Sequence, residues 1–227
     1  MDDFSFDRFA EFIREYWSVS DRRQITSETQ FERDLGLTGD DGEDLLRATE
    51  KRFGISLWSE ETGLRHTFNL EPNEYLFHSE GLELFPYLLT RFFGREKHSV
   101  RKFTVGELFE AVQKRKLKEA QQALCEQYGA KFASPSDQDK IGFAASTLGI
   151  RPINGLRHPV TPGSSGWYVW CGETLSEGTD FFEPQHASHI YKRMHCISHL
   201  LALPPGYRFL WTEQHLDVWF DETLLNV

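Results

Sequence analysis

The period of the hydrophobic pattern changes along this chain, and the change limits the possible folds more than any other sequence feature. Before about residue 118, apolar residues recur at the three- and four-residue spacing of helices. After about residue 140, short aromatic and β-branched runs are separated by glycine and proline, as in strands joined by turns. The chain of 227 residues also exceeds the usual length of one compact domain. We therefore expect an α+β protein with two domains, residues 1–118 and 119–227.

The first half predicts a small four-helix bundle with one long connection. A first helix is expected from Phe6 to Tyr16, and a second begins at Gly39 and stops at Gly54. A third is expected over residues 81–93. A fourth follows Thr104-Val105-Gly106-Glu107, a capping box in which the hydroxyl and the carboxylate satisfy each other's backbone N–H groups.

The second half predicts an α+β domain with a small, mainly antiparallel sheet of three or four strands. Residues 151–166 hold three prolines and three glycines, which predicts a long loop without regular structure. The elements expected around this loop are a helix over 120–128, strands over 141–149 and 167–171, a helix over 184–201, and an antiparallel pair over 207–211 and 217–221.

Composition argues against several classes of protein. The net charge of −10 does not favour nucleic-acid binding, and no apolar run approaches the length of a membrane span. The acidic start, Met1-Asp2-Asp3, lacks the basic lead of a signal peptide, so we expect a cytoplasmic protein. Cys125, Cys171 and Cys196 lack the close pairing of a structural zinc site and are interpreted as free thiols.

The first half contains the motif of a carrier protein without its modified residue. The segment 29–37, Thr-Gln-Phe-Glu-Arg-Asp-Leu-Gly-Leu, resembles the acyl-carrier-like proteins, in particular a bacterial family of carrier-like domains with no assigned function. In a working carrier, a serine near this point takes the phosphopantetheine arm, whereas here Gly39 occupies that position. The resemblance implies a carrier scaffold used for contacts, with no cofactor. Its acidic residues either face a basic partner or form a solvated helix start: Asp34, Asp40, Asp41, Glu43 and Asp44.

The second half, from about Ala120 to Val227, resembles a bacterial immunity-protein domain of polymorphic toxin systems. The resemblance rests on four ordered blocks: 152–159, 166–173, 180–182, and 203–210 with 218–221. It implies a non-catalytic protein that binds a cognate toxin in the producing cell and neutralises it by stoichiometric occlusion. The identity of the toxin and the oligomeric state are left open by the sequence.

The expected binding surface lies on two loops of the second half, residues 151–166 and 172–184. Acidic side chains there could steer a basic toxin, although an ordinary solvated loop is equally compatible with the pattern. Of the four tryptophans in this half, 167, 170, 211 and 219, we expect three in the core and one exposed. The expected partner-binding residues are Arg157, His158, Trp170, Glu173, Glu177, Asp180 and Glu183.

Two other functions remain open. The expected helix over 184–201 places His186 three residues before His189, and His195 four residues before His199, a spacing found in metal sites. The two pairs would point about 180° apart on a straight helix, and no glutamate lies between the histidines, so a metal-dependent enzyme is the less favoured alternative. No nucleophile or phosphate-loop motif is present, and no catalytic or metal residue is assigned. The second alternative is a regulatory adaptor whose bundle docks the enzymes that modify acyl carriers.

Overall fold

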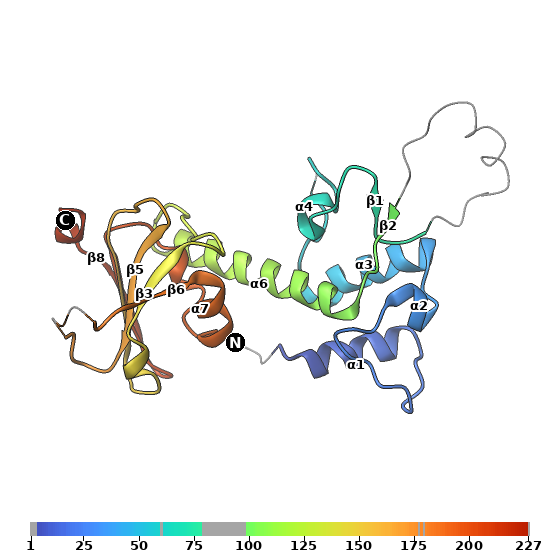
Figure 1. Cartoon of the computed structure of the whole chain (residues 1–227), viewed down its shortest axis with the longest axis horizontal. Helices are drawn as coiled ribbons and strands as arrows, with labels where there is room; N and C mark the ends of the chain where they lie inside the picture. The colour runs from blue at the N-terminus through green and yellow to red at the C-terminus, as the bar shows by residue number, and fades with distance from the viewer. Residues whose placement is uncertain (1–3, 60, 79–98, 177, 179, 227) are drawn as a thin grey trace. The chain divides into compact units, whose positions relative to one another are not determined.

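A computed structural model of the chain describes residues 4–59, 61–78, 99–176, 178 and 180–226 (Figure 1). The chain divides into two compact units, Met1–Lys116 and Leu117–Val227, here called the N-terminal and C-terminal units. Helix α6 (Val105–Gln127) begins in the first unit and ends in the second. The expected boundary after residue 118 therefore falls inside a helix.

The N-terminal unit is helical, as expected. Its described elements are α1 (Phe6–Tyr16), α2 (Phe31–Leu35), α3 (Gly39–Phe53), α4 (Arg65–Phe68), the first part of α6, and the parallel two-residue strands β1 (Glu74–Tyr75) and β2 (Ser99–Val100). Phe9 is fully buried at the centre of the unit, and its ring centroid lies 5.5 Å from those of both Phe53 and Phe109. The helix expected over residues 81–93 lies outside the described residues.

The helix boundaries of this unit follow the local sequence signals. Gly54 adopts a left-handed conformation, φ 66°, and ends α3 where a glycine stop was expected. At the start of α6, the backbone N–H of Glu107 donates to the Thr104 hydroxyl at 3.2 Å. The Thr104 N–H in turn donates to the Glu107 carboxylate at 2.9 Å, so the predicted capping box is confirmed.

The C-terminal unit contains a six-stranded sheet rather than one of three or four strands. Its strand order is β6-β3-β5-β4-β7-β8. Only the β3–β5 pair is parallel among these neighbours, so the sheet is mainly antiparallel, as expected. The strands are β3 (Lys140–Phe143), β4 (Ile153–Arg157), β5 (Ser164–Cys171), β6 (Glu183–His186), β7 (Tyr207–Trp211) and β8 (Leu216–Phe220).

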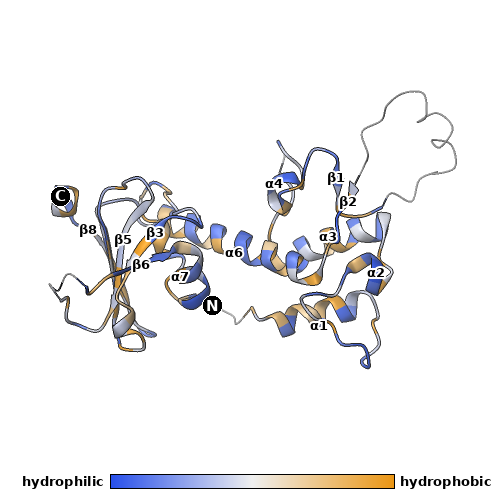
Figure 2. Cartoon of the chain, viewed as in Figure 1, coloured by the Kyte–Doolittle hydropathy of each residue, from blue (hydrophilic) through white to orange (hydrophobic). Residues whose placement is uncertain are grey.

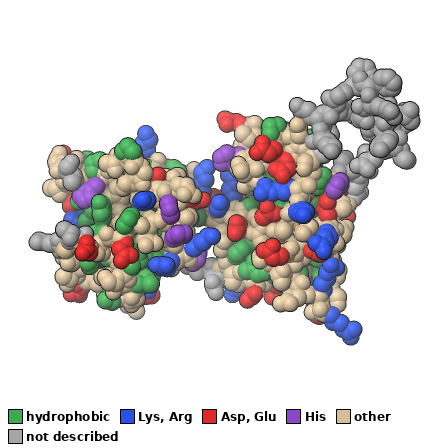
Figure 3. Space-filling model, viewed as in Figure 1, with side chains coloured by type: hydrophobic (Ala, Val, Ile, Leu, Met, Phe, Trp, Pro, Cys, Tyr) green, Lys and Arg blue, Asp and Glu red, His purple; other side chains and the backbone are tan. Residues whose placement is uncertain are grey.

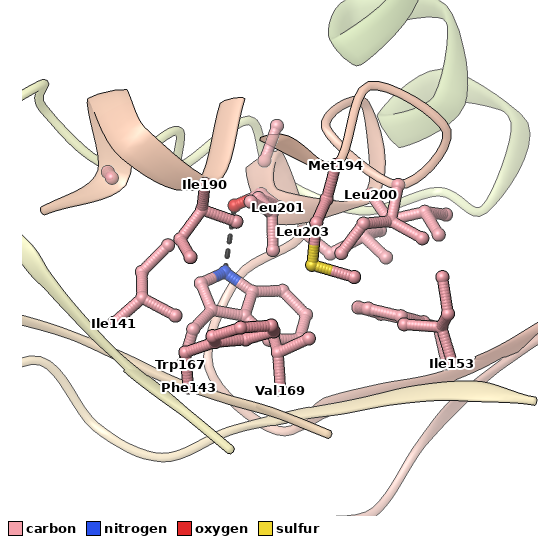
Figure 4. Close-up of a cluster of buried hydrophobic side chains, with 14 of the residues drawn as sticks. Ile141, Phe143, Ile153, Trp167, Val169, Ile190, Met194, Leu200, Leu201 and Leu203 are labelled. Atoms are coloured by element: carbon pink, nitrogen blue, oxygen red, sulfur yellow. Dashed lines mark hydrogen bonds between the residues drawn. The ribbon is translucent and has the colours of Figure 1, made fainter. Parts of the chain in front are cut away.

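One face of this sheet is covered by α7 (Ala187–Arg193), the end of α6 and the 3₁₀ turn η2 (Leu200–Ala202) (Figure 1). Trp167 lies fully buried between these helices and the sheet. Its indole N–H donates to the carbonyl of Leu201 at 2.8 Å, and this hydrogen bond joins strand β5 to the turn η2 (Figure 4). We call this side of the sheet the helix face and the opposite side the outer face.

The predicted loop over residues 151–166 is wrong, because it contains β4 near the middle of the sheet. Gly155 was interpreted as a turn residue, but it lies within β4 under the ring of Phe209. A Cβ atom at Gly155 would lie 2.2 Å from that ring, so packing requires the glycine there. The predicted strand over 141–149 is too long, since β3 ends at Phe143 and the turn η1 (Ala145–Thr147) follows.

The predicted helix over residues 184–201 is also wrong. The segment instead forms the hydrophilic edge strand β6, the two-turn helix α7 and the turn η2, and Figure 2 shows β6 beside the more hydrophobic β3. Helix α7 ends at Arg193, and Met194, the residue after it, has a non-helical φ of −126°. The four consecutive residues 200–203 are all fully buried, and a regular helix would turn some of them away from the sheet.

Candidate partner-binding surface

The outer face of the C-terminal sheet presents two rows of side chains that run across four strands. Directly paired residues of neighbouring strands project to the same face, so the pairing register gives each row. From β8 to β5, the first row is Trp219, Arg208, Leu156 and Tyr168. The second row is Asp217, Leu210, Asn154 and Trp170.

Only part of the outer face is covered. The rings of Phe181 and Phe182 pack over β5, with Phe182 centred 5.0 Å from Tyr168 and 6.3 Å from Trp170. Leu224, from the terminal turn η3 (Glu222–Leu225), packs into the same small cluster. On the β8 side the face is open, because Asp217 is exposed and 38% of Trp219 is exposed.

A chain of contacts holds Trp219 in place. The Arg208 guanidinium lies 5.5 Å from the Trp219 ring centroid, within the range of a cation–π contact. The same guanidinium forms an ion pair with Asp221 at 2.9 Å. Asp221 also accepts hydrogen bonds from Thr223, and these bonds together with Arg208 hold the pKa of Asp221 below its usual value. Trp219 is therefore an exposed aromatic side chain on a fixed support.

Two buried donors on the outer face lack acceptors among the described residues. They are the indole N–H of Trp170 and the Nε–H of Arg208. A buried polar group without a partner is unusual in folded proteins and is expensive to leave unsatisfied. The region around Arg208 thus combines an exposed tryptophan, a cation and an unused donor.

Arg157, one of the expected partner-binding residues, is structural. Its side chain projects to the helix face and is only 3% exposed. The guanidinium donates to the carbonyls of Ser165, Ala133 and Leu203 at 2.9, 2.6 and 2.5 Å. Burial lowers the pKa of Arg157 to about 10, which still leaves it charged at neutral pH. It joins three segments of the unit and is closed to a partner.

The other expected residues are dispersed. Trp170 is 5% exposed, and His158 is half-buried, with its Nδ1 atom 3.0 Å from the Leu224 carbonyl. Glu183 lies on β6, at the opposite edge of the sheet from β8. The acids at 173, 180 and 183 are exposed, and Glu177 lies outside the described residues.

Sequence reasoning missed Arg208 and did not single out Trp219. Of the four tryptophans, 167 and 170 are buried, 211 is half-buried, and 219 is the exposed one. The signal was present in the predicted hairpin of residues 207–221. Pairing its strands in register places Arg208 opposite Trp219, on the face away from the buried Phe209.

The histidines do not assemble a metal centre in the described part of the chain. His186 precedes α7 and His189 lies within it, with ring centroids 5.7 Å apart. His186 Nδ1 lies 3.0 Å from the carbonyl of Gln138. No group of three or more potential ligands is found among the described residues. Burial raises the pKa of all three free thiols, at 125, 171 and 196, so none is activated as a thiolate.

Residues 120–221 match the family model of the Imm33-like domain. This match supports the immunity-type resemblance of the C-terminal half, and it spans all six strands of the sheet. The N-terminal unit lies outside the Imm33-like match. No curated protein and no solved structure matches the chain. In the described residues, no helix is both long enough and apolar enough to cross a membrane.

Proposed function

We propose that this chain is an immunity protein that binds a cognate toxin in the cytoplasm of the producing cell and blocks it by occlusion, without catalysis. The match of residues 120–221 to the Imm33-like domain carries the proposal. The function therefore belongs to the C-terminal unit, which has the sheet with the half-open outer face.

The contact surface that we propose is the β7–β8 part of the outer face. Tryptophan and arginine dominate the binding energy of many protein interfaces, especially where they are held rigidly. Trp219 and Arg208 have this character, since Arg208 is fixed by Asp221.

Charge supports a basic partner. Residues 117–227 contain 12 aspartates and glutamates against eight lysines and arginines, and Figure 3 shows acidic, basic and hydrophobic side chains interspersed on the C-terminal unit. Glu173, Asp180 and Glu183 are exposed on this unit. Dispersed acids of this kind accelerate association with a basic protein and contribute less to the affinity of the final complex.

The test begins with capture of partners by the tagged full chain from the cells that make it. A captured protein is then expressed alone and with the chain, to learn whether it stops growth and whether the chain restores growth. Trp219→Ala should weaken binding by roughly 10- to 100-fold, the loss typical of a hot-spot residue, and should reduce the rescue.

Trp58→Ala is the matched control, because Trp58 is 61% exposed but lies in the N-terminal unit. It should leave binding and rescue unchanged. Recovery of no growth-inhibiting partner, or equal effects of the two substitutions, would contradict the proposal.

A further inference from the structure

The two edges of the C-terminal sheet differ in how they are protected. An unpaired edge strand exposes backbone N–H and C=O groups that can pair with another strand. Proteins usually prevent such pairing with a proline or a charged side chain on the edge strand, or by keeping that strand very short. Strand β6 forms one edge and β8 forms the other. Each strand carries one acidic residue, Glu183 on β6 and Asp217 on β8, but β6 contains a proline, Pro184, and β8 (Leu-Asp-Val-Trp-Phe) contains none.

The hydrogen-bond pattern shows which groups of β8 point outward. Asp221 N–H donates to the Gly206 carbonyl at 2.7 Å, and Thr212 N–H donates to the His215 carbonyl at 2.8 Å. Bonded and non-bonded pairs alternate along an antiparallel ladder, so Asp217 and Trp219 also direct their backbone groups toward β7. The backbone groups of residues 216, 218 and 220 therefore point away from the sheet.

These outward groups have no hydrogen-bond partner in the described part of the chain. No hydrogen bond from another described segment reaches the backbone of residues 216, 218 or 220. The same edge carries exposed aromatic side chains, since Phe220 is 53% exposed beside Trp219. On β6, by contrast, the outward positions are 184 and 186, and the proline at 184 has no N–H to offer.

Charge selects the strand that this edge would accept. Residues 215–222 contain three acids and no lysine or arginine. Asp221 is paired with Arg208, whereas Asp217 and Glu222 make no ion pair within the described residues. A second copy of β8 would place carboxylates next to these acids, and like charges repel. A strand bearing lysine or arginine would instead neutralise them.

We propose that β8 is a strand-addition site, where an extended, basic strand of the partner protein pairs with the backbone of Leu216, Val218 and Phe220 and extends the sheet. This inference rests on the proposed function, because it states how the toxin is held. The backbone hydrogen bonds supply a defined register, and the exposed aromatics beside them supply apolar contact.

The test uses the ¹⁵N-labelled full chain and two ten-residue peptides as probes, one alternating valine with lysine and one alternating valine with glutamate. In the free chain, the amides of residues 216, 218 and 220 should exchange rapidly with solvent. The valine–lysine peptide should slow their exchange, and it should bind about tenfold more tightly than the valine–glutamate peptide at low salt.

Two variants separate the contribution of the Phe220 backbone N–H to peptide binding from that of its ring. Phe220→Ala and Phe220→Pro both remove the ring, but only proline also removes the outward N–H, and it leaves the bonds to β7 in place. Phe220→Pro should bind the valine–lysine peptide about tenfold more weakly than Phe220→Ala does. The amides of β7 report whether each variant is folded.

Unchanged exchange at the three amides, or equal binding of both peptides, would overturn the inference. Slow exchange in the free chain together with the mass of a dimer would also overturn it, because a second copy would then occupy the edge. Any of these results would leave the proposed function standing, provided that a toxin is still captured and that its binding is weakened by Trp219→Ala. Failure to capture a toxin would instead count against the function, whatever the peptides show.

Discussion

His199 links the stability of the C-terminal unit to pH. Its Nδ1 atom is buried and has no hydrogen-bond partner among the described residues, and burial lowers its pKa below the ordinary value of 6.5. Below pH 6.5 the unfolded chain binds a proton that the folded chain accepts only at lower pH. The free energy of unfolding should therefore fall as the pH drops from 6.5 toward the pKa of the folded state.

Thermal melting at pH 7.5 and 5.5 checks this prediction. The wild-type chain should lose more stability on acidification than His199→Gln, because the glutamine stays neutral throughout. His215→Gln is the control, since His215 is exposed on the turn before β8, and it should behave like the wild type. An equal pH dependence in the wild type and His199→Gln would show that His199 does not control the effect.

Single charged residues were the hardest part of the site to predict. Arg157 lies in a stretch rich in proline and glycine, which predicts a surface loop. An arginine in such a loop is expected to be exposed to solvent. Its position depends on three carbonyls from residues 133, 165 and 203, which are distant in the sequence and meet only in the folded unit. No local pattern contains that information.

The start of α3 argues against acyl carriage by this chain. Gly39, which the predicted carrier-like resemblance places at the position of the carrier serine, is buried and has a left-handed backbone with φ 46°. A serine there would adopt a strained backbone conformation. We predict that Gly39→Ser destabilises the chain by roughly 1 kcal/mol in urea unfolding, since a left-handed conformation disfavours any residue with a Cβ.

The same variant tests the adaptor alternative. Neither the wild type nor Gly39→Ser should gain mass when incubated with coenzyme A and a phosphopantetheinyl transferase, while a functional carrier protein in the same assay should. Modification of Gly39→Ser would show that the transferase recognises the start of α3, and it would favour the adaptor.

Elements with a strong local signal were predictable, and elements decided by packing were not. The α1 bounds, the Gly54 stop and the pairing of residues 207–211 with the next strand all follow from periodicity and caps. Strand β4 was missed because Gly155 was interpreted as a turn residue, whereas it leaves space within the strand for the ring of Phe209. The helix over 184–201 was overpredicted, although the fully apolar run at 200–203 conflicts with helical amphipathicity.

At the scale of the whole chain, each unit has a hydrophobic core of its own. The core of the C-terminal unit includes Leu124 and Cys125 at the end of α6, and the amide of Gln121 donates to the Ser198 carbonyl at 3.2 Å. The last turns of α6 therefore belong to the same core as the sheet. This arrangement agrees with a family match that begins at residue 120, inside the helix.

A fragment of residues 117–227 should therefore fold alone and bind the captured toxin with an affinity within about twofold of the full chain, because it contains the whole core and the outer face. A fragment starting at residue 129 is the matched control, since it keeps every strand but loses Gln121, Leu124 and Cys125 from the core. It should unfold at lower urea concentration or fail to fold. Circular dichroism and calorimetric titration measure both properties. If fragment 117–227 folds but binds much more weakly than the full chain, the N-terminal unit contributes directly to toxin recognition.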